Sequence, residues 1–117
     1  MKKDWVYRRG DIYFADLGDR LGCEQTGTRP ILVIQNDIGN KFAPTLTVLP
    51  ITSNIKKTTL PTHAVLPPDT VLKRESMVMA EQIVTIDKNR VLSYVGQLDN
   101  VHLNRVMEAV QIHIGVR

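Results

Sequence analysis

Hydrophobic residues in this chain occur mostly in short runs separated by glycine, proline, asparagine and aspartate, a pattern that predicts strands joined by turns. The runs cover residues 11–17, 30–35, 45–52, 62–66, 76–86 and 92–98. The second run is continuously apolar and rich in β-branched residues, which indicates a strand buried on both faces. Pro50 is expected to mark the edge or end of the third strand, because proline cannot donate to a ladder. Residues 36–44 and 69–74 are predicted to be connectors.

After residue 98 the spacing of hydrophobic residues becomes helical. One face of this segment would carry Leu103, Val106, Met107, Val110 and Ile114. Asp99 is suited to cap the start of the helix and Gly115 to end it. The sequence therefore predicts a mainly β domain of five to seven antiparallel strands with one C-terminal helix. Such sheets commonly close into a small barrel, which protects their edges.

Composition places the chain among ordinary globular domains. With 117 residues, 43% of them hydrophobic and 23% charged, it is expected to form a single domain over residues 1–117. The net charge of +3 is too small to indicate nucleic-acid binding. Cys23 is the one cysteine and has no internal disulfide partner, which favours a reducing, cytoplasmic location. Neither a signal peptide nor a membrane span is expected.

Several common chemistries lack their motifs in this sequence. There is no zinc-ligand spacing, P-loop, dinucleotide-binding glycine pattern or serine-hydrolase elbow, so no metal or cofactor is expected. His63, His102 and His113 have no visible partner and are interpreted as ordinary surface or helix-face residues.

A polar cluster at strand ends is the remaining candidate site. The long, glycine-bearing loop 18–28 contains Cys23, Glu24 and Gln25, and loops of this length are usually functional or disordered. Arg29 follows the loop, and its five N–H donors suit a phosphate. Thr52 ends the third strand with a hydroxyl that can donate to a phosphate oxygen. On these grounds alone, a surface ion pair and a structural threonine are the commoner interpretations.

Several separated motifs closely resemble the MazF/PemK-type toxins, especially their Gram-positive branch. The motifs are Arg-Gly-Asp-Ile-Tyr-Phe-Ala-Asp-Leu at 9–17, Gly-Cys-Glu-Gln-Thr-Gly-Thr-Arg-Pro at 22–30, Val-Ile-Gln-Asn-Asp-Ile-Gly-Asn at 33–40, Pro-Ile-Thr at 50–52, Leu-Pro-Thr-His at 60–63 and Glu-Gln-Ile-Val-Thr-Ile-Asp-Lys at 81–88. They occur in the family's order and cover nearly the whole chain. The resemblance is therefore highly specific.

The resemblance implies an SH3-like barrel of the CcdB/PemK kind, acting as a homodimer in a type II toxin–antitoxin system. It further implies cleavage of single-stranded messenger RNA at short sequences, and neutralisation by a MazE-like antitoxin whose C-terminal segment lies across the RNA groove. By motif, the catalytic residues fall on Arg29 and Thr52. Glu24 and Gln25 match the loop that flanks the substrate, and Gln82 matches a position near the RNA path.

One departure from the family pattern concerns recognition. Cys23 stands where the family usually carries serine, in a loop that helps to select the RNA sequence. This change puts the recognition sequence in doubt and leaves the reaction untouched.

A metal-free mechanism fits these residues. RNA supplies its own nucleophile, the 2′-OH, so the enzyme needs only to align the chain and stabilise charge. We hypothesise that Arg29 stabilises the phosphorane and that Thr52 bonds a non-bridging oxygen or the 2′-OH region. The products would be a 2′,3′-cyclic phosphate and a 5′-hydroxyl. Lys56 and Lys57 would either steer the RNA backbone or form a solvated charge pair. Phe14 would either stack on a base or, more commonly for a strand residue, join the core.

Three alternatives remain open at this stage. The chain could be a non-catalytic SH3-like barrel that binds nucleic acid or a peptide, a toxin of the same fold that poisons a topoisomerase as CcdB-type proteins do, or an inactive relative that binds an antitoxin. The pattern also leaves open whether the helix packs on the barrel or joins the dimer contact.

Overall fold

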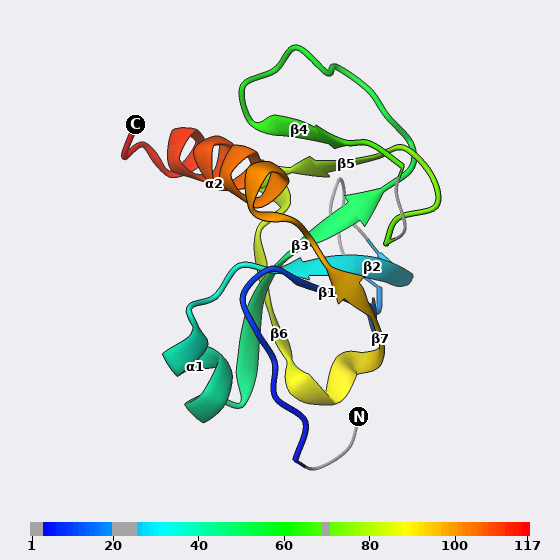
Figure 1. Cartoon of the computed structure of the whole chain (residues 1–117), viewed down its shortest axis with the longest axis vertical. Coiled ribbons are helices and arrows are strands. Elements are labelled where there is room, and N and C mark those ends of the chain that lie inside the picture. Colours follow the sequence, from blue (N-terminus) through cyan, green and yellow to red (C-terminus); the bar gives the residue numbers. More distant parts are fainter. Residues whose placement is uncertain (1–3, 20–25, 69–70) are drawn as a thin grey trace.

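The computed structural model describes residues 4–19, 26–68 and 71–117. Within these ranges the chain forms seven strands, two α-helices and two short 3-10 helices (Figure 1). In chain order they are β1 (Asp11–Asp16), β2 (Thr28–Val33), α1 (Asp37–Phe42), β3 (Thr45–Thr52), β4 (His63–Leu66), β5 (Ser76–Met79), η1 (Ala80–Gln82), β6 (Val84–Asp87), η2 (Lys88–Arg90), β7 (Val91–Gln97) and α2 (Asn100–Ile114). The predicted mainly β class, the number of strands and the C-terminal helix are confirmed. No helix in the described ranges is long and apolar enough to cross a membrane.

The strands form one antiparallel sheet in the order β4-β5-β3-β2-β1-β7, and β6 makes an additional pair with β3. Hydrogen bonds do not close this sheet into a ring, because the path ends at β4 on one side and at β7 on the other within the described residues. The sheet is strongly bent, with β6 and β7 on one side of the molecule and β4 and β5 on the other (Figure 1).

Pro50 lies inside β3, so the expectation that it marks an edge or end of the strand is wrong. On one side of β3 it pairs with Ile31 of β2. On the other side β3 pairs with β6 as far as Val48 and with β5 from Ile51 onward. Proline is tolerated here because the residue with no N–H falls in the gap between two partner strands.

The three central strands are buried on both faces, which confirms the prediction made for the apolar run at 30–35. Residues 31–34 are all buried. Alternate side chains enter two separate cores, as the two-residue period of a strand requires. The first core includes Ile12, Leu32, Leu49 and Ile51, and the second includes Tyr13, Ile31, Val33, Leu46 and Val48.

The C-terminal helix α2 covers the first core and lies across β4 and β5 (Figure 1). The Asp99 carboxylate caps it by accepting the backbone N–H of His102 at 2.9 Å, and this bond holds the pKa of Asp99 below its usual range. Gly115 ends the helix in the left-handed conformation with φ 81°. Both predicted caps are confirmed, and within this chain the helix packs on the sheet. Ile114 is an exception to the predicted apolar face, because it is 57% exposed beyond the end of the core.

Two local features differ from the expectations. The connector at 36–44 contains the short helix α1, whose first turn is capped by Asn36 accepting from the Gly39 N–H at 2.8 Å. The apolar run at 76–86 is two strands, because η1 separates β5 from β6. A run of hydrophobic residues does not show where the backbone turns when both sides of the turn are partly buried.

A buried hydrogen-bond chain ties the N-terminal segment to β1. The Tyr13 hydroxyl donates to Asp11 Oδ2 at 2.6 Å and accepts from Trp5 Nε1 at 2.9 Å. Arg8 N donates to the same Asp11 oxygen at 2.9 Å. Burial, together with the bond to Asp11, raises the pKa of Tyr13, so its hydroxyl stays protonated as a donor.

This chain provides a test of stability. We expect Tyr13→Phe to lower the free energy of unfolding by about 1–3 kcal/mol, because Asp11 and Trp5 both lose a buried partner. Urea denaturation would measure the change. Tyr94→Phe is the matched control, since the Tyr94 ring packs on Trp5 and Tyr13 and is 45% exposed. Equal effects of the two substitutions would contradict the assigned role of the Tyr13 hydroxyl.

Candidate functional site

Arg29 is held at the start of β2 by its backbone and by its side chain. Its backbone pairs with Ala15 of β1, a fully buried residue. Its Nε–H donates to the Thr26 carbonyl at 2.7 Å. The partly buried guanidinium is therefore fixed at its base, while this bond uses only one of its five N–H donors.

The loop that precedes Arg29 is closed at its neck by two backbone hydrogen bonds. Leu17 N donates to the Gly27 carbonyl at 2.9 Å, and Gly27 N donates to the Gly18 carbonyl at 3.0 Å. Gly18 and Gly27 both adopt positive φ, which lets the chain reverse within this short neck. The bond from Arg29 to Thr26 therefore reaches a segment whose base is fixed.

Thr52 ends β3 and is 7% exposed. Its Oγ1 accepts from Asn54 N at 3.1 Å, which leaves the hydroxyl hydrogen available to donate elsewhere. In the β2–β3 pair, Ile31 lies opposite Pro50. The same register extended by two residues brings Arg29 level with Thr52. The two predicted catalytic residues thus lie at the same end of two neighbouring strands.

A cavity of about 400 Å³ opens at this end of the sheet. It is lined by Phe14, Thr28, Arg29, Pro30, Ile51, Ser53, Val71, Leu72, Lys73, Arg74, Ser76 and Val95. Three cationic residues, Arg29, Lys73 and Arg74, thus line the cavity together with apolar ones. This combination suits a ligand that carries both a phosphate and a flat apolar group.

Phe14 is not part of the core, so the commoner interpretation of this residue was wrong. It is 42% exposed and lines the cavity. Ile12 and Tyr13 are buried on opposite faces of β1. Phe14, two residues after Ile12 on the same face, borders the cavity instead of the core. An exposed aromatic ring beside cationic side chains is an available stacking surface.

The other predicted site residues lie in different places. Cys23, Glu24 and Gln25 fall outside the described residues. Lys56 is exposed in the loop after Thr52, and Gln82 is partly buried in η1. The cavity lining includes the neighbours of Thr52, Ile51 and Ser53, but not Thr52 itself, Lys56 or Gln82.

Lys73 and Arg74 were missed as site residues, because the segment that carries them was interpreted only as a connector. Both are exposed and both line the cavity. Two adjacent cations just before the apolar run of β5 are the signal that could have found them. Which strand end they approach depends on the fold and is not visible in the local sequence.

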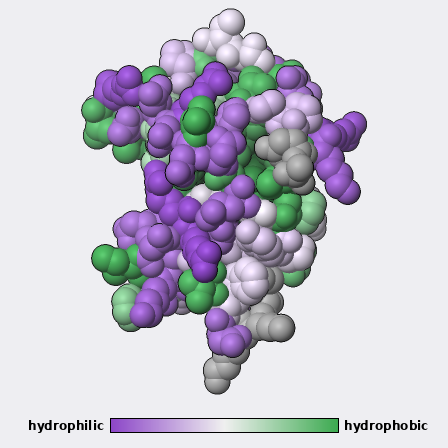
Figure 2. Space-filling model, viewed as in Figure 1, coloured by the Kyte–Doolittle hydropathy of each residue, from purple (hydrophilic) through white to green (hydrophobic). Residues whose placement is uncertain are grey.

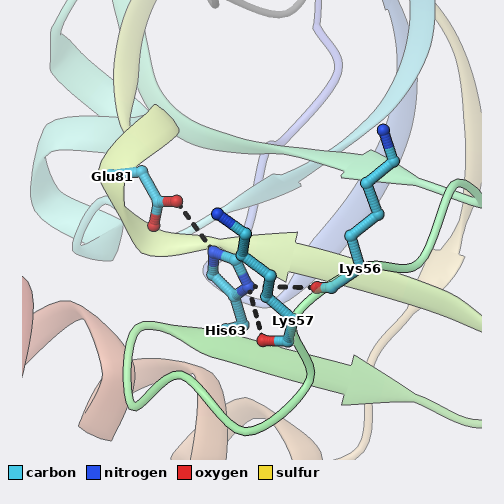
Figure 3. A network of polar contacts seen from close by, with 4 residues as sticks. All are labelled: Lys56, Lys57, His63 and Glu81. Atoms are coloured by element: carbon cyan, nitrogen blue, oxygen red, sulfur yellow. Dashed lines mark hydrogen bonds and ion pairs between the residues drawn. The ribbon is translucent and has the colours of Figure 1, made fainter.

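Two of the three histidines have partners, contrary to the expectation. His102 Nδ1 lies 2.7 Å from Asp99 Oδ2. His63 Nε2 lies 2.8 Å from Glu81 Oε2, and the His63 side chain is only 5% exposed (Figure 3). Nowhere in residues 4–19, 26–68 and 71–117 do three His, Cys, Asp or Glu side chains gather as metal ligands would.

The molecular surface is mixed in character. The face in Figure 2 is largely hydrophilic, and α2 contributes many of its polar side chains. Hydrophobic side chains appear in smaller areas, one of them over α1, where Ile38 and Phe42 are 75% and 74% exposed. The polarity of the surface as a whole therefore does not single out a binding site. The cavity lined by Arg29, Lys73 and Arg74 does.

Comparison with known proteins assigns this architecture to a toxin class. The family model described as "PemK-like, MazF-like toxin of type II toxin-antitoxin system" matches residues 8–114. The chain belongs to this family.

Among curated relatives, the chain is 46% identical over 112 residues to "Endoribonuclease EndoA" of Bacillus subtilis (strain 168), covering 95% of this chain and 97% of the relative. It is 42% identical over 112 residues to "Endoribonuclease MazF" of Staphylococcus saprophyticus, covering 95% and 93%. Among solved structures, MazF from Deinococcus radiodurans superposes with a TM-score of 0.83 at 23% identity, covering 96% of this chain and 99% of that one. This last likeness supports the predicted fold class.

Gly96 allows a close approach between β7 and the cavity wall, and this gives a second test. A methyl group at Gly96 would lie 2.8 Å from Val71 Cγ1. We therefore expect Gly96→Ala to cost about 1–3 kcal/mol of stability through overpacking, measured by urea denaturation. The double variant Gly96→Ala/Val71→Ala should recover part of this loss, because it removes the clashing methyl groups. If the double variant instead lost as much stability as Gly96→Ala and Val71→Ala added together, the two residues would not be in contact.

Proposed function

We propose that this chain is the toxin of a type II toxin–antitoxin system and a sequence-specific endoribonuclease that cleaves single-stranded messenger RNA at the Arg29–Thr52 end of the sheet. The observation that carries the proposal is the position of Arg29. It is a cation fixed at its base, level with the Thr52 strand end, in a cavity that also offers Phe14, Lys73 and Arg74. The family membership and the names of the curated relatives support the same activity.

The proposed reaction is a transesterification within the RNA. The 2′-oxygen forms a bond to phosphorus while the bond from phosphorus to the 5′-oxygen breaks. The 2′-OH releases a proton and the 5′-oxygen takes one up, leaving a 2′,3′-cyclic phosphate and a 5′-hydroxyl. The N–H groups of Arg29 that do not bond Thr26 stabilise the charge that builds up on the phosphorane. The Thr52 hydroxyl donates to a non-bridging oxygen or to the 2′-OH region.

Charge stabilisation is the role that suits Arg29 better than proton transfer. An arginine side chain loses its proton only above about pH 12, so it is a poor general base at neutral pH. A fixed guanidinium aimed at the phosphate needs no change of protonation. The nucleophile comes from the substrate itself, so the proposed reaction proceeds without a metal or another cofactor.

RNA binding uses the mixed character of the cavity. An unstacked base lies against the Phe14 ring, and Lys73 and Arg74 face the neighbouring phosphates. Lys56 extends the basic surface along the loop after Thr52. The family pattern adds Cys23, Glu24, Gln25 and Gln82 as RNA-contacting residues.

The proposed partners follow from the same assignment. A toxin of a type II system has a cognate antitoxin, here a MazE-like protein whose C-terminal segment would occupy the RNA groove. The active form is a homodimer, and its place of action is the cytoplasm, where messenger RNA is translated. Cleavage of that RNA would stop translation and growth.

End-mapping of transcripts after brief expression tests the proposed function. New 5′-hydroxyl ends at a recurring short sequence would support it. Intact transcripts with arrested DNA replication would favour a topoisomerase poison of the same fold, and intact RNA incubated with the purified dimer would favour a non-catalytic binder or an inactive relative.

Removing the guanidinium should affect the chemical step more than binding. We expect Arg29→Ala to lower kcat by about a hundredfold or more, a typical effect of losing one transition-state donor, with RNA affinity largely kept. Single-turnover cleavage and a separate binding assay would measure the two effects. Arg105→Ala, an equal change of charge on an exposed position of α2, is the control. Parallel losses of binding and cleavage in Arg29→Ala would make Arg29 a docking residue.

Chelation tests the metal-free chemistry. We expect the initial rate of RNA cleavage to be unchanged in excess EDTA, because the 2′-OH and Arg29 together need no metal-bound water. A metal-dependent nuclease assayed in the same buffer is the control. Loss of cleavage in EDTA that is restored by a divalent cation would contradict the proposed chemistry.

A further inference from the structure

The loop after Thr52 is tied to η1 through a single buried imidazole. His63 begins β4, and its side chain is 5% exposed. Its Nε2 lies 2.8 Å from Glu81 Oε2, and its Nδ1 lies 3.1 Å from the Lys57 carbonyl and 3.3 Å from the Lys56 carbonyl (Figure 3). The ring therefore bridges two segments that are far apart in the sequence.

Within the described residues, the hydrogen-bond partners of this ring are all acceptors. A carboxylate faces one ring nitrogen and two backbone carbonyls face the other. A neutral imidazole carries one N–H and one lone pair, so it can satisfy only one side and would turn its lone pair toward an acceptor on the other. The doubly protonated ring satisfies both sides at once. Lys56 and Lys57 turn carbonyl oxygens toward the ring, and Glu81 is the charged side chain that bonds it.

Glu81, on the other side of the ring, is ionised and can accept a hydrogen bond from His63. Burial by itself would raise the pKa of Glu81, but hydrogen bonds from His63, from its own backbone and from Thr62, with the attraction of the His63 charge, hold it below its usual value. Glu81 is therefore an ionised acceptor at neutral pH.

The loop conformation on the other side is one that needs support. Lys57 has φ 51°, and within the described residues no other non-glycine residue has a positive φ. A side chain in this region is sterically disfavoured and persists where its surroundings hold it. The Lys57 carbonyl accepts from Leu60 N at 3.1 Å as well as from the His63 ring. The ring thus bonds directly to the strained residue.

We propose that His63 is a positioning residue for RNA cleavage: clamped as an imidazolium between Glu81 and the Lys56 and Lys57 carbonyls, it holds the loop after Thr52 so that its lysines face the RNA backbone. The proposal rests on the proposed function, because it concerns binding of the same substrate. It joins two of the expected RNA-contacting positions, since Lys56 lies within the clamp and Gln82 follows Glu81 directly.

Substitution of the ring separates this role from catalysis. We expect His63→Phe, which keeps a ring of similar size without donors, to raise KM for RNA about tenfold and to change kcat less than threefold, as loss of a binding interaction does. His102→Phe is the matched control, because its partner Asp99 lies at the start of α2. A large loss of kcat with unchanged KM, or no change in either constant, would overturn the proposal.

Trypsin gives a second measurement that needs no RNA, because it cuts after lysine and the loop carries Lys56 and Lys57. Mass spectrometry of short digests of the folded protein would give the cleavage rate at these two sites, normalised to an unstructured lysine peptide. We expect His63→Phe to be cut there at least tenfold faster than the wild type and His102→Phe to match the wild type. Unchanged cleavage in a folded His63→Phe would overturn the clamp even if RNA cleavage is confirmed.

Glu81→Gln keeps the proposal testable if His63→Phe does not fold. A glutamine amide can donate to Nε2 while Nδ1–H donates to the carbonyls, so a neutral ring then satisfies both sides. Glu81→Gln should therefore keep the loop as resistant to trypsin as it is in the wild type, whereas Glu81→Leu, which leaves Nε2 without its acceptor, should be cut there at least tenfold faster. Equal cleavage of the wild type and Glu81→Leu would overturn the clamp. If RNA stays intact when it is incubated with the wild-type protein, the proposed function is refuted. The trypsin result on the loop would still stand.

Discussion

The antiparallel pairing of β2 with β3 is the constraint on which the rest of this molecule depends. Both strands are buried on both faces, so a shift by one residue would exchange the side chains of two cores at once. Extended by two residues beyond the Ile31–Pro50 pair, the same register brings Arg29 level with Thr52. Packing in the interior thereby fixes the relative position of two polar residues that belong to neither hydrophobic core.

The site gains its chemistry where this pairing stops. Beyond Ile31 and Pro50, β2 continues beside β1 and β3 continues beside β5, and near this end a cavity opens that is lined by cationic residues and by Phe14. Arg29 and Thr52 therefore stand at the ends of paired strands, and Arg29 lines the cavity. His63 links the loop after Thr52 to η1 through hydrogen bonds.

The sequence predicted those parts of the structure that follow from periodicity. The apolar run at 30–35, the strand at 45–52 and the capped helix α2 were all evident, because burial patterns and caps leave local signals. The break at η1, the place of Pro50 between two partner strands and the exposure of Phe14 were not evident, because each depends on which strands become neighbours. For the same reason Lys73 and Arg74 were overlooked, and the partner of His63, 18 residues away at Glu81, was invisible. Arg29 and Thr52 were singled out mainly by resemblance to a family, and their residue types alone would not have sufficed.

The closed neck at Leu17, Gly18 and Gly27 has a consequence for how such toxins diversify. Because backbone bonds alone close the neck, its closure does not depend on which side chains stand between Gly18 and Gly27. Arg29 Nε donates to the backbone carbonyl of Thr26, just inside the neck, so this bond does not depend on the side chain at position 26 either. The residues inside the neck can therefore differ among relatives built on this plan without disturbing how Arg29 is held.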